Sequence, residues 1–447
     1  MHRYLTKTVY SLGGILFLQA VLAENKPNVI IIYTDDQGTL DLNCYGASDL
    51  LTPNIDALAT EGVRFTQFYA APVSSVSRAN LLSGQFSKHA EVTGNVSGKG
   101  LPLEKETLPE RMRDNGYKTA LIGKWHLGDG AEYSPNRHGF DYFWGFRGGC
   151  VDSYSHFFYW SGPNKHDLWE NEKEIFSYGD FLTEKSLQQM KMFIENNQVE
   201  PFFVYWAVNI PHYPLQGHPK WLEYYSDLEN PRRMYAAFLS TLDDYVGDLR
   251  SYLEENNLLE NTIIIFQSDN GHSMETRTFG GGGYCGDYRA GKFSLFEGGI
   301  RVPAIIRYPA KLPQNEVRNQ LAMNIDWFPT IVDLCEISSK NMQVDGKSLV
   351  PVLVENADTP HDALHFDYGN QWAVRSGDWK LIYKVGDTTP GSHTPIGIDY
   401  FLANMKIDST ESRNLLSNYP EIKQELLKKR NEYLNSLNQP VNQMSPF

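Results

Sequence analysis

Two groups of oxygen-bearing side chains follow apolar runs that are typical of buried β-strands. Asp35 and Asp36 come just after the run NVIIIY, and Asp269 and Asn270 come just after the run TIIIFQ. Ligands of open α/β sheets bind beyond the carboxyl ends of the strands, so these side chains are placed to meet. Adjacent carboxylates repel one another unless a cation holds them, and hard oxygen donors favour Ca²⁺ or Mg²⁺ over zinc. Either pair alone could consist of turn residues only, but the two together favour a metal site.

A third pattern joins a serine and an arginine at the start of an expected helix. The stretch SSVSR covers residues 74–78. A serine at a helix N-terminus is most often a cap, and this is the simpler interpretation of any one of these serines. Ser74 and Arg78, however, are spaced i and i+4 and therefore share one helix face. A helix N-terminus with an arginine on the same face can bind an anion.

Further candidates are basic or imidazole side chains next to expected strands. Lys124 and His126 alternate with Trp125, so on an extended segment they point the same way. His212 follows the run FFVYWA, and Lys292 lies in the loop YRAGKFSLFEGGIRVP. A single histidine or lysine is more often solvated or packed, so none of these residues identifies a site alone.

The elements that must position these residues follow an α/β pattern. Buried strand-like runs alternate with helical segments, which predicts a large central mixed or parallel sheet flanked by helices. Beyond residue 355 the runs become short and are joined by tight turns, which predicts a small C-terminal α+β subdomain with an antiparallel sheet. The expected organisation is a signal peptide at 1–23, a catalytic α/β domain at 24–355 and the C-terminal subdomain at 356–447.

Composition and the first residues restrict the class of protein. The 447 residues are 41% hydrophobic and carry a net charge of −14, which argues against a nucleic-acid binder or a basic membrane-surface protein. Positive charge for an anionic ligand must therefore be concentrated locally. Arg3 and Lys7 precede a short apolar stretch, and Val21 and Ala23 form a cleavage pattern. We expect a signal peptide cleaved near Ala23 and a periplasmic or secreted product, with a retained N-terminal anchor as the alternative.

The cysteines give little direction. None of the four forms a CxxC pair, which disfavours a zinc site or a thioredoxin motif. Cys150 and Cys285 both lie in glycine-rich loops and could pair in an oxidising compartment, but four unpaired thiols are an equal alternative.

Taken together, the sequence resembles the type I sulfatases of the alkaline-phosphatase-like superfamily. Residues 74–84 match the core motif of that family except at Val76, where the family has Pro or Ala. Other motifs of the family follow in the right order over nearly the whole chain: TDDQG at 34–38, TPNIDALATEGVRF at 52–65, GKWHLG at 123–128, NIPHYP at 209–214, SDNG at 268–271, GKFSLFEGGIRVP at 291–303 and WAVRSGDWKL at 372–381.

The resemblance implies a role for each matching residue. Ser74 is the position that is oxidised to formylglycine in the family. The implied metal ligands, usually for Ca²⁺ with Mg²⁺ as a possibility, are residue 74 with Asp35, Asp36, Asp269 and Asn270. The remaining implied roles are binding of formylglycine by Arg78 and Lys124, a base at His126, and contacts to the sulfate and leaving oxygen from His212 and Lys292, with His212 as the acid.

The resemblance also implies a maturation step. A formylglycine-generating maturase must modify Ser74, and Val76 departs from the sequence that such an enzyme reads. Val76 therefore concerns the efficiency of modification rather than the geometry of the site. A serine rather than a cysteine at position 74 implies an anaerobic radical maturase and hence a bacterium. If this serine replaces a natural cysteine, the chain would stay unmodified and inactive.

The implied function is removal of sulfate from a sulfated carbohydrate, with exo action on the end of a glycan. Aromatic-rich loops such as SYSHFFYW suit sugar rings, although they could equally be core packing. His218, His272 and Arg289 are candidate sugar contacts. The alternatives are a phosphonate monoester hydrolase or phosphodiesterase of the same superfamily, and a non-catalytic sulfoglycan-binding protein in which Ser74 is not matured.

Overall fold

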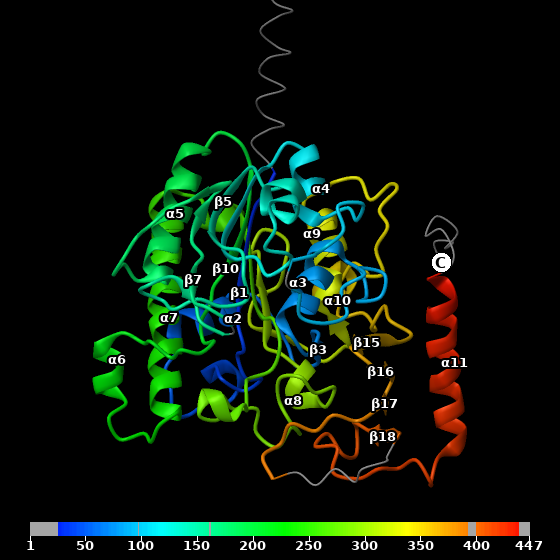
Figure 1. Cartoon of the computed structure of the whole chain (residues 1–447). Helices are drawn as coiled ribbons and strands as arrows, with labels where there is room; N and C mark the ends of the chain where they lie inside the picture. Colours follow the sequence, from blue (N-terminus) through cyan, green and yellow to red (C-terminus); the bar gives the residue numbers. More distant parts are fainter. Residues whose placement is uncertain (1–25, 97, 161, 392–398, 438–447) are drawn as a thin grey trace, which may run out of the picture.

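A ten-stranded mixed sheet forms the centre of the molecule (Figure 1). The computed structural model describes residues 26–96, 98–160, 162–391 and 399–437, and the predicted signal peptide lies outside these ranges. The strand order is β13-β2-β12-β11-β1-β10-β4-β5-β8-β9. The bounds are β1 Asn28–Thr34, β2 Val63–Phe65, β4 Lys118–Lys124, β5 Tyr142–Phe146, β8 Trp169–Glu170, β9 Lys173–Glu174, β10 Phe202–Ala207, β11 Thr262–Ser268, β12 Ala304–Arg307 and β13 Glu316–Arg318.

The four strands in the middle of this sheet, β11, β1, β10 and β4, are parallel. Nearly every residue in them is buried, as their continuous apolar sequences predict. The register pairs Thr34 with Ser268 and Tyr33 with Ala207. Because β1, β10 and β11 end at the same level, the residues that follow them meet at one edge of the sheet.

Helices cover both faces of the sheet because alternate strand residues point to opposite sides. Ile30 and Ile32 of β1 pack with α2, α5 and α7, whereas Ile31 and Tyr33 pack with α3, α4, α9 and α10. The bounds are α2 Pro53–Thr60, α3 Ser74–Ser83, α4 Leu108–Asp114, α5 Leu182–Asn196, α7 Arg232–Glu255, α9 Trp327–Leu334 and α10 Val350–Glu355. The predicted α/β fold is confirmed.

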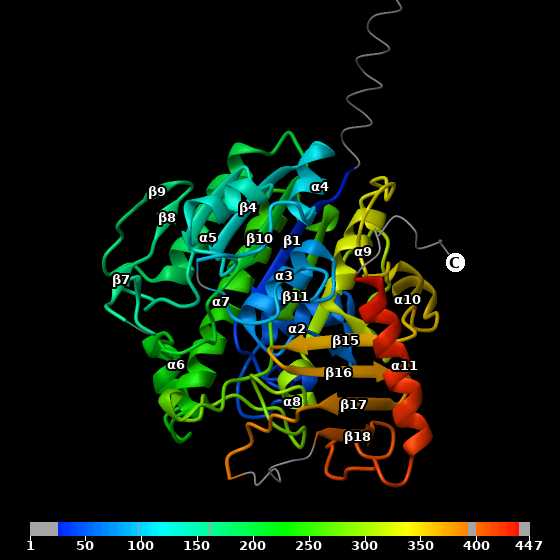
Figure 2. The same cartoon turned by 45° about the vertical axis from the view of Figure 1, so that its right-hand side comes forward.

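A second sheet near the C-terminus has four antiparallel strands (Figure 2). They are β15 Leu364–Tyr368, β16 Gln371–Ser376, β17 Trp379–Tyr383 and β18 Tyr400–Asn404, and α11 Pro420–Ser436 packs on β16 and β17. Apolar residues of this sheet, including Phe366 and Ile382, share a buried cluster with Leu295 and Phe296 of the larger domain. The predicted antiparallel subdomain is therefore present, and its boundary at residue 355 stays a prediction.

Short elements complete the described part of the chain. They are β3 Phe68–Tyr69, β6 Phe157–Phe158, β7 Lys165–His166, β14 Ala322–Met323, α6 Pro219–Tyr224, α8 Glu297–Ile300, and 3-10 turns at 43–45, 131–133, 135–138, 259–261, 276–278 and 324–326. None of the helices in the described ranges is long and apolar enough to cross a membrane.

Three details differ from the sequence-based expectation or decide between its alternatives. The sequence pattern predicts a helix at residues 78–83, and the observed helix begins one turn earlier, at Ser74. The strand β18 was not predicted, because it pairs with β17 only after a long intervening segment. All four cysteines are unpaired, so Cys150 and Cys285 form no disulfide. The thiol of Cys285 lies 3.1 Å from the carbonyl oxygen of Tyr288 instead.

Candidate active site

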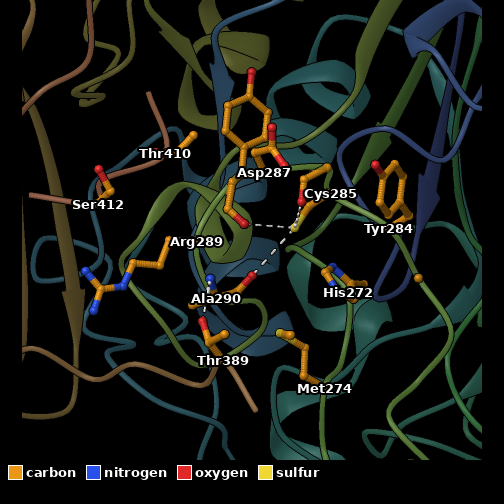
Figure 3. A pocket seen from close by; sticks show the side chains of 13 residues that line it. His272, Met274, Tyr284, Cys285, Asp287, Arg289, Ala290, Thr389, Thr410 and Ser412 are labelled. Carbon is orange, nitrogen blue, oxygen red and sulfur yellow. Dashed lines mark hydrogen bonds between the residues drawn. The ribbon is translucent and has the colours of Figure 1, made fainter. Parts of the chain in front are cut away.

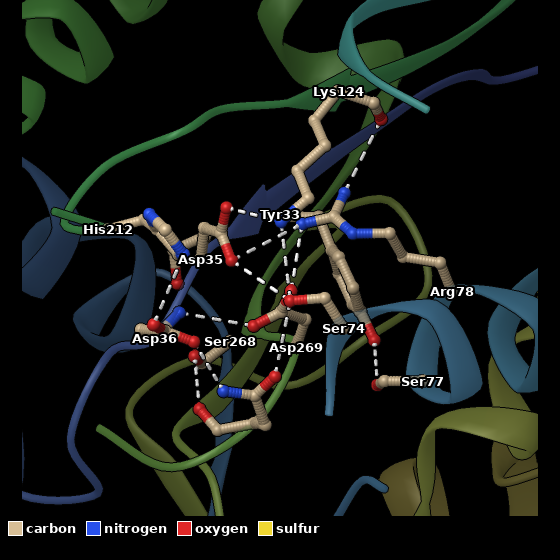
Figure 4. Close-up of polar contacts among 12 residues, drawn as sticks. Tyr33, Asp35, Asp36, Ser74, Ser77, Arg78, Lys124, His212, Ser268 and Asp269 are labelled. Atoms are coloured by element: carbon tan, nitrogen blue, oxygen red, sulfur yellow. Dashed lines mark hydrogen bonds and ion pairs between the residues drawn. The ribbon is translucent and has the colours of Figure 1, made fainter. Parts of the chain in front are cut away.

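The carboxyl ends of β1 and β11 and the start of α3 bring the predicted site residues together (Figure 4). The amide of Asp269 donates to the carbonyl of Thr34 at 3.0 Å, and the amide of Asp35 donates to the carbonyl of Ile210 at 3.0 Å. The first bond extends the β1–β11 pairing by one residue beyond the strands, and the second ties Asp35 to the segment that follows β10. The segments after β1, β10 and β11 are therefore held in contact at this edge.

Ser74 lies at the centre of this group as the first residue of α3. Its hydroxyl lies 3.1 Å from Oδ1 of Asp35, 3.4 Å from Oδ1 of Asn270 and 3.3 Å from Nζ of Lys124. Val73 before it is extended and provides no side-chain cap, so the helix N-terminus is open toward the site. The serine hydroxyl thus serves the cluster rather than capping its own helix.

Three buried carboxylates and one amide surround Ser74. Asp36 accepts a hydrogen bond from Nδ2 of Asn270 at 2.7 Å, and the amide of Asp36 donates to Oδ1 of Asp269 at 3.1 Å. Asp36 has a φ of +63°, which is unusual for a non-glycine residue and must be held by its surroundings. Oxygen atoms of Asp35 and Asp36 and a ring nitrogen of His212 all lie within 4.8 Å of one another.

Each carboxylate is matched by one cation. Lys124 Nζ lies 2.7 Å from Asp35, Lys292 Nζ lies 2.7 Å from Asp36, and an Arg78 nitrogen lies 2.8 Å from Asp269. Isolated charges would be very costly in such a buried place, and this pairing compensates them.

The pairing also sets the protonation of the two adjacent carboxyls. Burial by itself would raise the pKa of Asp35 and of Asp36. Lys124 reverses this for Asp35 and Lys292 reverses it for Asp36, so both pKa values fall below their usual range. Both groups are therefore carboxylates.

His126 follows β4 with a φ of +55°, and its amide donates to the carbonyl of Arg147 at 3.1 Å. Its buried Nδ1 has no hydrogen-bond partner among the described residues. Burial, followed by the nearby charges of Lys124 and Arg78, lowers the pKa of His126 well below its ordinary value. The ring is therefore neutral and able to accept a proton.

His212 lies in the segment that follows β10. Its Nδ1 lies 2.6 Å from the carbonyl oxygen of Tyr213, so this nitrogen carries the hydrogen. Its Nε2 lies 3.7 Å from Oδ2 of Asp36. Burial lowers the pKa of His212, although Asp35 and Asp36 oppose the shift.

The cluster opens into a cavity of about 610 Å³. Ser74, Lys124, His126, His212 and Lys292 all line this cavity. Arg78 does not, because its guanidinium is buried against Asp269 and the hydroxyl of Tyr205. Arg78 therefore holds Asp269 through an ion pair and does not reach the cavity.

The wall of the cavity also contains residues that the sequence did not single out. Lys165 Nζ lies 3.0 Å from Oδ2 of Asp129, and the guanidinium of Arg277 lies 3.3 Å from the ring centre of Trp160. Trp160 is the last residue of the aromatic loop SYSHFFYW, so its residue type was a signal. Asp129, Lys165 of β7 and Arg277 of the 3-10 turn at 276–278 come from separate segments, and only the tertiary structure brings them together.

The three sugar contacts expected from the sequence lie elsewhere. His218 caps α6, where its side chain accepts from the amide of Lys220. His272 and Arg289 line a different cavity, of about 620 Å³ (Figure 3). Arg289 is engaged there by Asp387, with Nη2 at 2.7 Å from Oδ2. None of the three lines the cavity that contains Ser74, and we therefore replace them as candidate substrate contacts.

The donor set matches what a hard divalent cation requires. Carboxylate, amide and hydroxyl oxygens converge, and the described part of the site offers no cysteine to the cluster. The three carboxylates and the three cations paired with them leave the cluster without net charge. The arrangement as a whole can bind an anion next to a serine-derived oxygen and two neutral imidazoles.

Comparison with known proteins adds a family to this geometry. A family model described as "Sulfatase" matches residues 27–337, and one described as "N-sulphoglucosamine sulphohydrolase, C-terminal" matches residues 288–434. Human arylsulfatase A is 32% identical, with 92% of this chain and 89% of that protein covered. Dog N-acetylgalactosamine-6-sulfatase is 31% identical over 81% of this chain and 73% of its own length. Mouse arylsulfatase J is 32% identical, and the chain spans 62% of its length.

Solved structures are similar over almost the whole chain. The structure of Ps i-CgsB in complex with k-i-k-neocarrahexaose has a TM-score of 0.82 at 27% identity, covering 93% of this chain and 94% of that chain. The PsFucS1 sulfatase from Pseudoalteromonas sp. has a TM-score of 0.78 at 23% identity, covering 95% and 93% of the two chains, which shows the shared fold.

Proposed function

Because the chain belongs to the sulfatase family, as its motifs predict, we propose that it hydrolyses the sulfate ester of a sulfated carbohydrate with residue 74 as the nucleophile. The observation that carries this proposal is the position of the Ser74 hydroxyl. It lines a cavity and lies within 3.4 Å of the side-chain oxygens of Asp35 and Asn270 and of the ammonium of Lys124. A serine that only capped its helix would need none of these contacts.

Ser74 acts after oxidation to formylglycine, whose hydrated form supplies two hydroxyls on one carbon for attack and for release of sulfate. Lys124 is placed to stabilise negative charge on the oxygen of residue 74, from which its Nζ lies 3.3 Å. The neutral His126 accepts a proton from the second hydroxyl. Arg78 fixes Asp269 and so acts behind the nucleophile rather than on the substrate.

Asp35, Asp36, Asp269, Asn270 and residue 74 hold a divalent cation, with Ca²⁺ preferred and Mg²⁺ as the alternative. Such an ion supplies Lewis acidity and orients the sulfate ester. The oxygen atoms support its presence, since carboxylate, amide and hydroxyl oxygens converge at this point. A dication makes the site positive by two charges, which a sulfate ester and a deprotonated nucleophile then balance.

Lys292 and His212 act on the substrate side. Asp36 and Asp35 overcome the effect of burial and raise the pKa of Lys292, so its ammonium stays charged next to a sulfate oxygen. His212 protonates the departing sugar oxygen from Nε2, which is the ring nitrogen that faces the cluster. For this role His212 must take up a proton when the substrate's negative charge arrives.

A sugar sulfate is the substrate class that the cavity supports. A volume of about 610 Å³ falls within the range of small-ligand sites and is sufficient for a sugar ring. Its rim combines an aromatic face at Trp160 with acceptor and donor groups at Asp129, Lys165 and Arg277, as sugar hydroxyls require. Among the relatives, N-acetylgalactosamine-6-sulfatase is named for a sugar sulfate, and Ps i-CgsB was solved with a neocarrahexaose.

The test has two parts. Turnover of sulfate esters and phosphate or phosphonate esters is measured side by side, and the intact mass of the tryptic peptide around Ser74 is determined. Sulfate turnover with a peptide lighter by two hydrogens supports the proposal. Preference for phosphorus esters identifies the phosphonate hydrolase or phosphodiesterase alternative. An unmodified Ser74 with binding but no turnover identifies a sulfoglycan-binding protein.

The cellular setting is part of the same proposal. The N-terminal sequence supports export to a periplasm or the cell exterior after cleavage near Ala23. The motif at 74–84 supports a transient complex with a maturase, and the other expected partner is the sulfated glycan substrate.

A further inference from the structure

We propose that the segment of residues 386–389, which follows β17 of the C-terminal sheet, is a clamp that positions Lys292. This inference rests on the proposed function in one respect, namely that Lys292 contacts the sulfate ester. The clamp itself is seen in contacts that lie outside the cavity around Ser74. The position of Lys292 therefore depends on segments that belong to both sheets and that are far apart in the sequence.

Every residue of the clamp contacts the loop of residues 289–294, which carries Lys292. The amide of Gly291 donates to the hydroxyl oxygen of Thr388 at 3.1 Å, and the amide of Ala290 donates to that of Thr389 at 3.1 Å. The hydroxyl of Ser294 donates to the carbonyl of Gly386 at 2.6 Å. The clamp thus binds groups on both sides of Lys292, two backbone amides before it and a side-chain hydroxyl after it.

Arg289 closes the same contact at the beginning of the loop. Its Nε lies 2.8 Å from Oδ2 of Asp387, and its Nη1 donates to the carbonyl of Glu411 at 2.9 Å. Asp387 in turn accepts from the amide of Thr389 through Oδ1 at 3.0 Å. Arg289, expected from the sequence as a sugar contact, is therefore part of the support for Lys292.

The backbone around Lys292 needs this support. Ala290 has a φ of +63° and Phe293 a φ of +72°, and both conformations are costly for residues that have a Cβ. Such conformations persist only where the surroundings determine them. Two backbone bonds hold the inner side of the loop, from Lys292 to His272 and from Phe293 to Pro72, both at 2.9 Å. The clamp holds the outer side.

The position of Lys292 matters because its ammonium reaches Asp36 through a long side chain, at 2.7 Å. A displacement of about 1 Å at a reacting centre can reduce a rate about a hundredfold. Loosening the backbone of residues 290 and 291 therefore moves the ammonium without removing it. A positioning role predicts that turnover falls more than the loss of stability explains, whereas mere stabilisation of the subdomain predicts that turnover follows stability.

The test compares Thr388→Val with Thr388→Ser, each normalised to the formylglycine content at residue 74. The valine keeps the shape but removes the acceptor for Gly291, and the serine keeps it. We expect Thr388→Val to lower kcat/KM about three- to tenfold and Thr388→Ser to restore it. In a Lys292→Ala background the valine should cause no further loss, because the effect passes through Lys292.

Thr359→Val is the matched control. The hydroxyl of Thr359 also joins the C-terminal part of the chain to the larger domain, donating to the carbonyl of Leu321 at 2.6 Å, but away from Lys292. It should lower the melting temperature to a similar extent while kcat/KM stays unchanged. Losses in kcat/KM that follow melting temperature in both variants would overturn the positioning role.

A crystal structure of Thr388→Val gives a readout that does not need activity. The expected result is a Lys292 ammonium that has left Asp36 or is spread over several positions. An unmoved Lys292 would overturn the proposal. If the native protein hydrolyses no sulfate ester but Lys292 moves in the variant, the proposed function fails and the clamp stands.

Discussion

The Ser74 hydroxyl lies 3.1 Å from Oδ1 of Asp35, although 39 residues separate the two in the chain. Ser74 is the first residue of α3, and Asp35 is the first residue after β1. The contact therefore joins a helix N-terminus to the end of the central strand. Nucleophile and acidic cluster form one structural unit, so a change in either should be visible in turnover.

The first prediction concerns Ser74. We expect Ser74→Ala to reduce turnover of any sulfate ester by about a thousandfold or more, because no other hydroxyl replaces the nucleophile. In a host with an anaerobic maturase, the native peptide should be lighter by two hydrogens in mass spectrometry. Ser75→Ala is the neighbouring control, since the hydroxyl of Ser75 accepts from the amide of Val96 instead. Native activity with a fully retained serine would contradict this prediction.

The second prediction concerns the metal. Asp35→Asn removes one negative charge from the donor set, and turnover should fall by about a hundredfold or more together with the bound metal. Metal content is measured by elemental analysis alongside the rate. Asp49→Asn serves as control, because Asp49 pairs with Arg232 away from the cluster. Unchanged turnover and metal content in Asp35→Asn would remove this residue from the ligand set.

The third prediction separates two roles of His212. A sugar alkoxide is a poor leaving group, so loss of an acid should cost about a hundred- to ten-thousandfold on a sugar sulfate. The loss should be much smaller on nitrophenyl sulfate, whose anion leaves unaided. The measurement is kcat/KM of His212→Ala on both substrates. Equal losses would show that His212 only binds sulfate and would leave Lys292 as the candidate acid.

The fourth prediction tests the substrate contacts chosen from the cavity. Lys165→Met keeps the stem of the side chain but removes the ammonium at the rim. We expect about a three- to tenfold loss of kcat/KM on the sugar sulfate and little change on nitrophenyl sulfate, which lacks the sugar hydroxyls. His218→Ala, in a separate cavity, should change neither rate. A loss on sugar sulfate from His218→Ala alone would favour the contacts expected from the sequence.

The fifth prediction is a pH dependence of stability from a buried cluster between the two sheets. Lys380 Nζ lies 2.8 Å from Glu297 and 2.7 Å from Glu411. Burial, together with Glu297, raises the pKa of Glu411 to about 7. Because the folded pKa exceeds the unfolded value, the folded state holds the proton more tightly. Protonation of Glu411 therefore contributes to the free energy of unfolding. This contribution is complete below the pKa of a glutamate in the unfolded chain and is lost as the pH rises through about 7.

The measurement is denaturant unfolding of Glu411→Gln and the native protein at several pH values. The native protein should lose stability on the order of 1–3 kcal/mol relative to the variant between pH 5 and pH 8. Glu297→Gln should alter the pH dependence only at acid pH. Lys380 lowers the pKa of Glu297 against the effect of burial, so the contribution of Glu297 to stability is lost only in acid. Parallel pH curves for the native protein and Glu411→Gln would contradict the prediction.

The sequence by itself determined the central sheet and the inner site. Continuous apolar runs such as β1 and β11 must be buried on both faces, and parallel strands buried in this way end at one edge. This pattern alone is sufficient to place Asp35 and Asp269 together. In the same way, the i, i+4 spacing of Ser74 and Arg78 is sufficient to place both residues on one face of α3. These inferences need only local periodicity and the general geometry of α/β sheets.

Only the tertiary structure decided which loops complete the site. Arg289 is close in sequence to Lys292, yet it lines another cavity, whereas Lys165 reaches the rim around Ser74 from a distant part of the chain. The support of Lys292 by residues 386–389 was equally invisible in the sequence. The positions of these segments depend on contacts between residues that are far apart in the sequence. Such contacts leave no repeating pattern in the sequence. Strands and helices have a regular periodicity of side-chain direction that can be seen in the sequence, and loops have none.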